Sequence, residues 1–205
     1  MKKKLNVPNT LSILRVILTP LFMLAAIITR DMHVAMRFVP AILFGLAAFT
    51  DFLDGKIARS QNIVTDFGKF IDPLADKFMI FGACITFLAI DSHTAPVFLW
   101  ISALVMLREL AVTSIRLVVA NTSGIVIAAS FFGKCKTVVQ ISAVVIMFLE
   151  PVFCYFAACL GIDALVWVFS RSILSYVFMS LMGIVTLASG IDYLRAYFPY
   201  INTDK

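Results

Sequence analysis

Charged residues are scarce in this chain: they make up 14% of its 205 residues, whereas hydrophobic residues make up 61%. A soluble domain is about a quarter charged and about half apolar, so the composition predicts a polytopic membrane protein. The net charge is +5, but the basic residues are interleaved with apolar runs rather than gathered on a polar domain. This distribution is not typical of a nucleic-acid-binding protein. We expect anionic lipids or anionic substrates as partners, and no nucleic acid.

Histidine and cysteine are also rare. The two histidines, His33 and His93, fall between apolar runs, and the four cysteines include no CxxC pair. No His stands at metal-ligand spacing from a Cys, so we interpret the cysteines as small buried hydrophobic residues. These absences argue against zinc chemistry and against nucleophilic catalysis that depends on histidine.

Apolar runs long enough to cross a bilayer occur six times, which predicts an all-α fold with six transmembrane helices. The predicted spans cover residues 11–29, 34–52, 70–90, 95–119, 137–156 and 172–193. We expect a short interfacial helix over residues 5–12 and a single domain over residues 1–205. A short seventh span within residues 154–169 stays open, because Pro151 and Gly161 mark a break there.

Lysine and arginine are unevenly distributed between the two ends of these spans. Of the 17 such residues, 14 lie at or near the ends that share a membrane side with the N-terminus; the exceptions are Arg30, Arg37 and Arg171. The positive-inside rule therefore predicts that both termini are cytoplasmic. Three lysines before an apolar run also resemble the start of a signal peptide. That run approaches spanning length, so we expect a retained first helix.

Five of the twelve acidic residues lie within residues 51–77, between two apolar runs. Residues spaced i, i+3, i+4 and i+7 share one helix face at the end of the second span: Asp51, Asp54, Gly55 and Ala58. Residues spaced i, i+4 and i+8 share a face at the start of the third: Gly68, Asp72 and Asp76. The linking segment SQNIVTD is short enough for a helical hairpin. We therefore expect four carboxylates to converge between two helices, with Asp66 off both faces.

Such a cluster requires a compensating charge, because each carboxylate near the hydrocarbon costs on the order of 2–3 kcal/mol if uncompensated. A structural ion network would draw this charge from nearby basic residues: Lys56, Arg59, Lys69 and Lys77. Asp72 before Pro73 would also fit a simple helix N-cap. We favour a metal site, because ligands that offer only oxygen suit Mg²⁺ or Mn²⁺. The small residues on both faces leave room for a diphosphate, which would bind two ions and an arginine clamp.

One stretch of the chain resembles the complete signature of the CDP-alcohol phosphotransferases: Asp51-x-x-Asp54-Gly55-x-x-Ala58-Arg59, eight residues, Gly68, three residues, Asp72, three residues, Asp76. The resemblance implies six transmembrane helices, a homodimer, and a CDP-linked lipid as donor. It implies that the four signature aspartates hold the metals and that Asp76 removes the proton of the acceptor hydroxyl. The signature glycines, Ala58 and Arg59 would contact the CDP moiety, with Thr50 nearby.

Basic residues outside this stretch predict where the acceptor binds. Arg108 and Arg116 are eight residues apart, which places both guanidinium groups on one side of the fourth span. Lys134 and Lys136 open the next span, on the same membrane side as the aspartates, and Glu109 is expected to restrain one of these cations. Cations this deep are costly unless an anion meets them, and a phosphate-bearing acceptor would do so. Snorkelling is the alternative, which suits the lysines better than the arginines.

A narrower resemblance spans most of the chain. The stretches NVPNTLSILRVILTP, RELAVTSIR, GKCKT with Gln140, and SGIDYL are similar to bacterial phosphatidylglycerophosphate synthases. The resemblance implies transfer of the phosphatidyl group of CDP-diacylglycerol to sn-glycerol 3-phosphate, with release of CMP, at the bacterial cytoplasmic (inner) membrane. It implies glycerol-phosphate contacts from the basic residues named above; Asn9 and Arg15 are further candidates near the same site.

Two kinds of alternative stay open. The same chemistry would serve another acceptor: phosphatidylglycerol, inositol phosphate or serine. Outside enzymes, an intramembrane carboxylate cluster is also typical of an ion or proton transporter. The acids of this chain gather at one membrane edge, and no acid at the middle of another span continues a path, which argues against transport.

Overall fold

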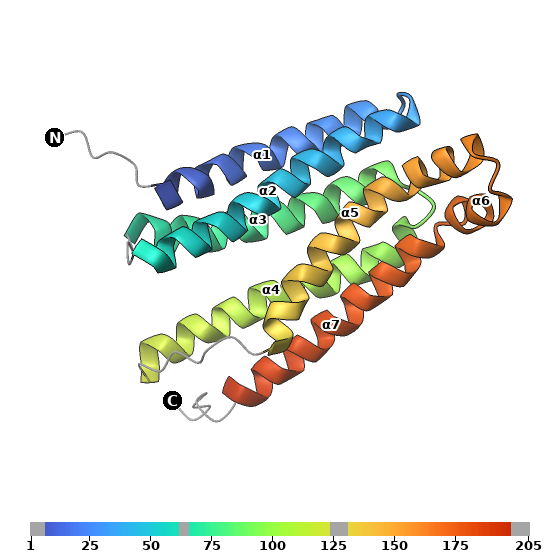
Figure 1. The fold of residues 1–205 in the computed structure, drawn as a ribbon. Helices are drawn as coiled ribbons and strands as arrows, with labels where there is room; N and C mark the ends of the chain where they lie inside the picture. The colour runs from blue at the N-terminus through green and yellow to red at the C-terminus, as the bar shows by residue number, and fades with distance from the viewer. Residues whose placement is uncertain (1–6, 62–65, 124–130, 198–205) are drawn as a thin grey trace.

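The computed structural model describes residues 7–61, 66–123 and 131–197 (Figure 1). Within these ranges, the side chains of residues 7–8, 54–61, 66, 69, 120–123, 131–132 and 134 lie outside the described part. The described chain forms seven α-helices and one 3-10 helix: α1 (Val7–Thr29), η1 (Val34–Arg37), α2 (Phe38–Gln61), α3 (Asp66–Ile90), α4 (Ala95–Ser123), α5 (Phe131–Cys159), α6 (Asp163–Ser170) and α7 (Ile173–Tyr197). It contains no strand, so the predicted all-α fold is confirmed.

Six of the described helices are long and apolar enough to cross a membrane, so this is a multi-pass membrane protein. Their apolar segments lie close to the predicted spans: Asn9–Thr29, Val34–Leu53, Phe70–Ile90, Ala95–Val119, Cys135–Cys159 and Ile173–Tyr197. α6 lies in the region where the sequence left a short seventh span possible. It has 8 residues, and a helix of that length rises only about 12 Å, too short to cross.

The start of α1 differs from the prediction. A separate interfacial helix is predicted over residues 5–12, whereas the structure continues one helix from Val7 to Thr29. Pro8 does not interrupt it, because a proline in the first turn lacks only an N–H that has no intrahelical partner. Asn9 and Ser12 are buried in the bundle, so their packing favours a continuous helix. Residues 5 and 6 lie outside the described part.

The helices form two packed groups. α1 packs mainly against α2 and α3, and α7 packs against α4 and α5. Contacts of α5 with α2 and α3, and of α4 with α3, join the groups. Figure 1 shows the described chain beginning and ending at the end of the bundle where α2 and α3 meet, with α6 at the opposite end. Six crossings return the chain to the side on which it started.

A glycine allows α1 and α3 to approach each other closely. A Cβ atom on Gly82 would lie only 3.0 Å from Sδ of Met23 and 3.0 Å from Cγ2 of Thr19. A larger side chain would therefore push the two helices apart. Thr19 lies one turn after Arg15 on α1, so this contact keeps the first part of α1 against α3.

Candidate active site

A cavity of about 450 Å³ is lined by residues of α2, α3, α4, α5 and α7. Four acidic and four basic residues are among those lining it: Asp51, Asp72, Asp76, Glu109, Lys77, Arg108, Arg116 and Lys136. The three aspartates come from α2 and α3, and we call them the acidic wall. Arg108, Arg116 and Lys136 come from α4 and α5, and we call them the basic wall. The cavity therefore brings together the two charged regions predicted from the sequence.

A buried arginine on α1 holds two carboxylates of the acidic wall. Nη1 of Arg15 lies 2.9 Å from Oδ1 of Asp51 and also pairs with Oδ1 of Asp76. The Arg15 side chain is 0% exposed, whereas that of Asp76 is 52% exposed and accessible to a substrate. The sequence favours divalent metal as the counter-charge, with the basic residues of the acidic stretch as the alternative. Among the described side chains, Arg15 supplies positive charge to these carboxylates. Its predicted contact with the acceptor stays a prediction.

Asp72 also bonds to α1. It accepts a hydrogen bond of 2.5 Å from the hydroxyl of Ser12. Asp72 lies inside α3, which begins at Asp66 and continues through Pro73, so it is not the N-cap of this helix. Ser12 and Arg15 are one turn apart, so one face of α1 contacts all three aspartates of the acidic wall. No pattern in the sequence predicts that Ser12 bonds to Asp72, which is 60 positions away.

The described lining of the cavity does not include every predicted site residue. The side chains of five lie outside the described part: Asp54, Gly55, Ala58, Arg59 and Lys134. Four others are described and buried but are not among the residues that line the cavity: Thr50, Gly68, Asn9 and Arg15. The hydroxyl of Thr50 donates to the carbonyl of Ala47 at 2.7 Å. These residues therefore keep the roles that the family resemblance implies only as predictions.

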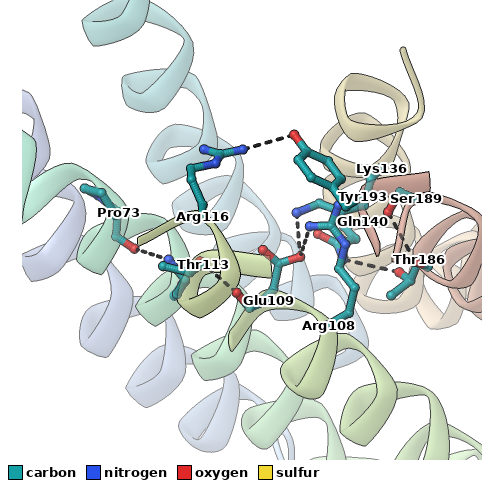
Figure 2. A network of polar contacts seen from close by, with 11 residues as sticks. Pro73, Arg108, Glu109, Thr113, Arg116, Lys136, Gln140, Thr186, Ser189 and Tyr193 are labelled. Atoms are coloured by element: carbon teal, nitrogen blue, oxygen red, sulfur yellow. Dashed lines mark hydrogen bonds and ion pairs between the residues drawn. The ribbon is translucent and has the colours of Figure 1, made fainter. Parts of the chain in front are cut away.

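Glu109 neutralises part of the basic wall (Figure 2). Its Oε1 atom accepts from Nη1 of Arg108 at 3.3 Å and from Nζ of Lys136 at 2.5 Å. The predicted restraint of a cation by Glu109 is thus confirmed. Arg108 is 9% exposed, and its buried Nε and Nη2 atoms have no hydrogen-bond partner among the described residues. Buried donors without a partner raise the free energy of the folded state, so this geometry favours binding of an anion.

Arg116 and Arg108 lie on the same side of α4, as predicted, and both meet the ring of Tyr193 on α7. The Cζ atom of Arg108 is 5.2 Å from the ring centroid, and that of Arg116 is 5.6 Å from it. Nη2 of Arg116 donates a hydrogen bond of 3.0 Å to the Tyr193 hydroxyl (Figure 2). Sequence reasoning missed Tyr193, although it falls in the quoted stretch SGIDYL, because no local pattern places α7 beside α4.

The donor chemistry of the acidic wall fits a divalent metal ion. Its three aspartates offer carboxylate oxygens, the ligands that Mg²⁺ and Mn²⁺ prefer. The guanidinium of Arg15 shows that Asp51 and Asp76 already accommodate a positive charge between them. The described residues contain no complete group of three or more His, Cys, Asp or Glu arranged around one point. Asp54, the fourth predicted ligand, lies outside the described side chains, so the structure describes only three of the four predicted ligands.

The family model for CDP-alcohol phosphatidyltransferase matches residues 5–188. This chain belongs to that family. The matched residues include all of the acidic wall and all of the basic wall, whereas Tyr193 lies beyond them. The family catalyses transfer to an alcohol from a CDP-linked donor and generally depends on a divalent metal.

Bacterial relatives give the same result. The CDP-diacylglycerol–glycerol-3-phosphate 3-phosphatidyltransferase of Bacillus subtilis is 42% identical over 148 residues, which cover 68% of this chain and 74% of the relative. The protein of the same name from Pseudomonas fluorescens is 32% identical over 209 residues, 98% of this chain and 94% of the relative. The protein of the same name from Haemophilus influenzae is 31% identical over 196 residues, which cover 94% of this chain and 93% of the relative. The family resemblance predicted from the motifs is therefore confirmed.

Proposed function

We propose that this protein transfers the phosphatidyl group of CDP-diacylglycerol to sn-glycerol 3-phosphate and releases CMP. One observation carries the proposal: a single cavity joins the carboxylates of α2 and α3 to the cations of α4 and α5. The reaction needs a base and a counter-charge for a diphosphate on one side, and an anion site for the acceptor on the other. The names of the three relatives described above support the same pair of substrates.

The basic wall would bind the phosphate of the acceptor. Its three cations and Glu109 together carry a formal charge of +2, and a phosphate monoester carries about −1.5 to −2 at pH 7. The unpartnered Nε and Nη2 atoms of Arg108 form the forked donor pair that a phosphate accepts. Lys134 stays a predicted contact from the same helix as Lys136.

Asp76 would act as the general base. Its half-exposed carboxylate takes the proton of the acceptor hydroxyl, and the hydroxyl oxygen attacks the phosphorus nearest the diacylglycerol. A new phosphorus–oxygen bond forms to glycerol 3-phosphate. The bond from that phosphorus to the CMP oxygen breaks, and CMP leaves with the electron pair. The ion pair with Arg15 orients the Asp76 carboxylate before the substrate arrives.

Two Mg²⁺ or Mn²⁺ ions would be held by the four signature aspartates: Asp51, Asp54, Asp72 and Asp76. When bound, such ions supply positive charge to the diphosphate and to the leaving CMP. A second set of signature residues would border the CDP moiety: Thr50, Gly55, Ala58, Arg59 and Gly68. The two glycines and Ala58 leave space for the ligand beside the helix backbones.

The active site and both termini would face the cytoplasm, in the bacterial cytoplasmic (inner) membrane. Support comes from the 14 of 17 lysines and arginines that lie at or near that side of the spans. The described chain also begins and ends at one end of the bundle. A single domain over residues 1–205 and assembly as a homodimer complete the proposal, and the homodimer rests on the family resemblance alone.

Release of CMP by the purified protein tests the proposal. CDP-diacylglycerol and Mg²⁺ are supplied with one acceptor at a time: glycerol 3-phosphate, phosphatidylglycerol, inositol phosphate or serine. We expect CMP with glycerol 3-phosphate, loss of CMP release with EDTA, and recovery when Mg²⁺ or Mn²⁺ is added in excess. CMP with a different acceptor alone would reassign the acceptor. No CMP with any acceptor would contradict the enzyme assignment and favour transport.

A further inference from the structure

Tyr193 links both arginines of the basic wall to α7 (Figure 2). The residue itself is held firmly, because it is 6% exposed and packs in a small apolar cluster with Val112 and Val119. The ring of Tyr197 stacks on it, with centroids 5.9 Å apart and an interplanar angle of 13°. The phenol therefore offers a rigid support at the edge of the cavity.

Arg116 is the residue that needs such a support. Its side chain is exposed, whereas Arg108 is buried and also bonded to Glu109. A long exposed side chain loses rotamer entropy when it binds a ligand, which weakens the affinity. The two guanidinium groups lie near the same ring and carry like charges, and the aromatic ring offsets part of their repulsion. The Tyr193 hydroxyl engages one of the five N–H donors of Arg116 and so limits its rotation.

We propose that Tyr193 is a positioning residue that holds Arg116 beside Arg108, at the spacing that lets both bind one phosphate group. The inference rests on the proposed function of the basic wall as the acceptor-phosphate site. Tyr193 acts through Arg116, so it controls the affinity for the phosphate-bearing acceptor. It does not contact the acidic wall through any described hydrogen bond or ring contact, so donor binding and the chemical step are independent of it.

Steady-state kinetics of full-length variants test this role, with the concentrations of CDP-diacylglycerol and glycerol 3-phosphate varied separately. Tyr193→Phe removes the hydroxyl and keeps the ring; we expect an acceptor KM about fivefold higher, with kcat and donor KM within about twofold of wild type. Tyr193→Leu removes the ring as well, and the acceptor KM should rise about twentyfold. Tyr176→Phe is the matched control, because Tyr176 lies at the other end of α7 beside His93. An unchanged acceptor KM in Tyr193→Phe would overturn the proposal.

A double-mutant cycle distinguishes positioning from a separate contact. If Tyr193 acts through Arg116, Tyr193→Phe adds no further rise in acceptor KM to that of Arg116→Ala. Additive rises would show that Tyr193 acts independently and would overturn the positioning role. The failure of the proposed function looks different: wild-type protein would release no CMP with glycerol 3-phosphate. Normal wild-type turnover with an unaffected Tyr193→Phe variant would contradict the positioning role alone.

Discussion

Nη1 of Arg15 lies 2.9 Å from Oδ1 of Asp51, which joins the first half of α1 to the second half of α2. Asp76 of α3 pairs with the same nitrogen. Three helices therefore meet at one guanidinium group, which is fully buried. The buried Arg15 guanidinium depends on both carboxylates, because it would otherwise be an uncompensated charge, whereas Asp51 and Asp76 are partly solvated.

Replacement of Arg15 by Ala should therefore destabilise the fold as well as stop turnover. The Asp51 and Asp76 side chains are 31% and 52% exposed, so solvent screens part of the lost interaction and we expect a cost of about 1–3 kcal/mol, measurable as a lower Tm in detergent or as a lower denaturant midpoint. Arg15→Lys keeps the charge and should show a smaller loss. Arg30→Ala serves as the control: its side chain is 47% exposed beyond the other end of α1, so the change should stay below about 1 kcal/mol. Wild-type stability in Arg15→Ala would argue against this central role.

Asp76→Asn should abolish turnover while CDP-diacylglycerol still binds. The amide has nearly the same shape as the carboxylate but cannot take the proton of the acceptor, so the rate should fall by about 10²–10⁴-fold. CMP release measures turnover, and protection of the protein against thermal unfolding by the donor measures binding. Asp31→Asn is the matched control, because the Asp31 side chain is 90% exposed in the connection after α1. Activity of Asp76→Asn within about tenfold of wild type would remove Asp76 from the role of base.

Arg108→Ala should raise the acceptor KM more than Arg116→Ala does. Arg108 is buried, with two donors that lack a partner among the described residues, whereas Arg116 is exposed. We expect a rise of at least about tenfold, or about 1.4 kcal/mol, for Arg108→Ala, with the donor KM changed by less than about threefold. Arg171→Ala is the control, because the Arg171 guanidinium stacks on Trp167 at the far end of the bundle, with Cζ 4.2 Å from the ring centroid. Equal rises in both KM values would indicate general damage to the cavity instead.

The membrane fold was predictable because each span carries its own signal. A run of apolar residues of bilayer length is a local property, and the six predicted windows agree closely with the apolar helices of the structure. The convergence of three of the four signature aspartates was also predictable, since helical spacing places Asp72 and Asp76 on one face and a short connection returns the chain beside Asp51. The prediction of a separate interfacial helix was wrong for residues 7–12, which are described. They form the start of α1, where Asn9 and Ser12 are buried in the bundle.

The partners of the site residues were not predictable in the same way. Arg15 bonds to residues 36 and 61 positions further along the chain, and Tyr193 bonds to Arg116 across 77 positions. Spacing within one helix says which residues share a face, but it does not say which other helix meets that face. The tertiary packing of α1 on α3 and of α7 on α4 decides both contacts.

Glu150 provides a final contrast, because this buried acid serves the fold rather than the cavity. It is 1% exposed on α5, and its oxygens accept from the backbone N–H of Leu174 at 2.9 Å and that of Ser175 at 2.7 Å. The Ser175 hydroxyl donates to it as well. Glu150 thus caps the first turn of α7, whose N–H groups have no partner within the helix.

Glu150→Gln should lower the free energy of unfolding by about 1–3 kcal/mol, because an amide N–H would face a backbone N–H in place of one oxygen. Ser175→Ala removes only the hydroxyl and should cost less, about 1 kcal/mol. Both variants should keep the wild-type kcat and both KM values per folded molecule, since the cap lies near α6 and away from the cavity. Thermal unfolding and the CMP assay, run on the same preparations, measure the two effects. A lower kcat in Glu150→Gln at unchanged stability would instead give this carboxylate a part in the chemistry.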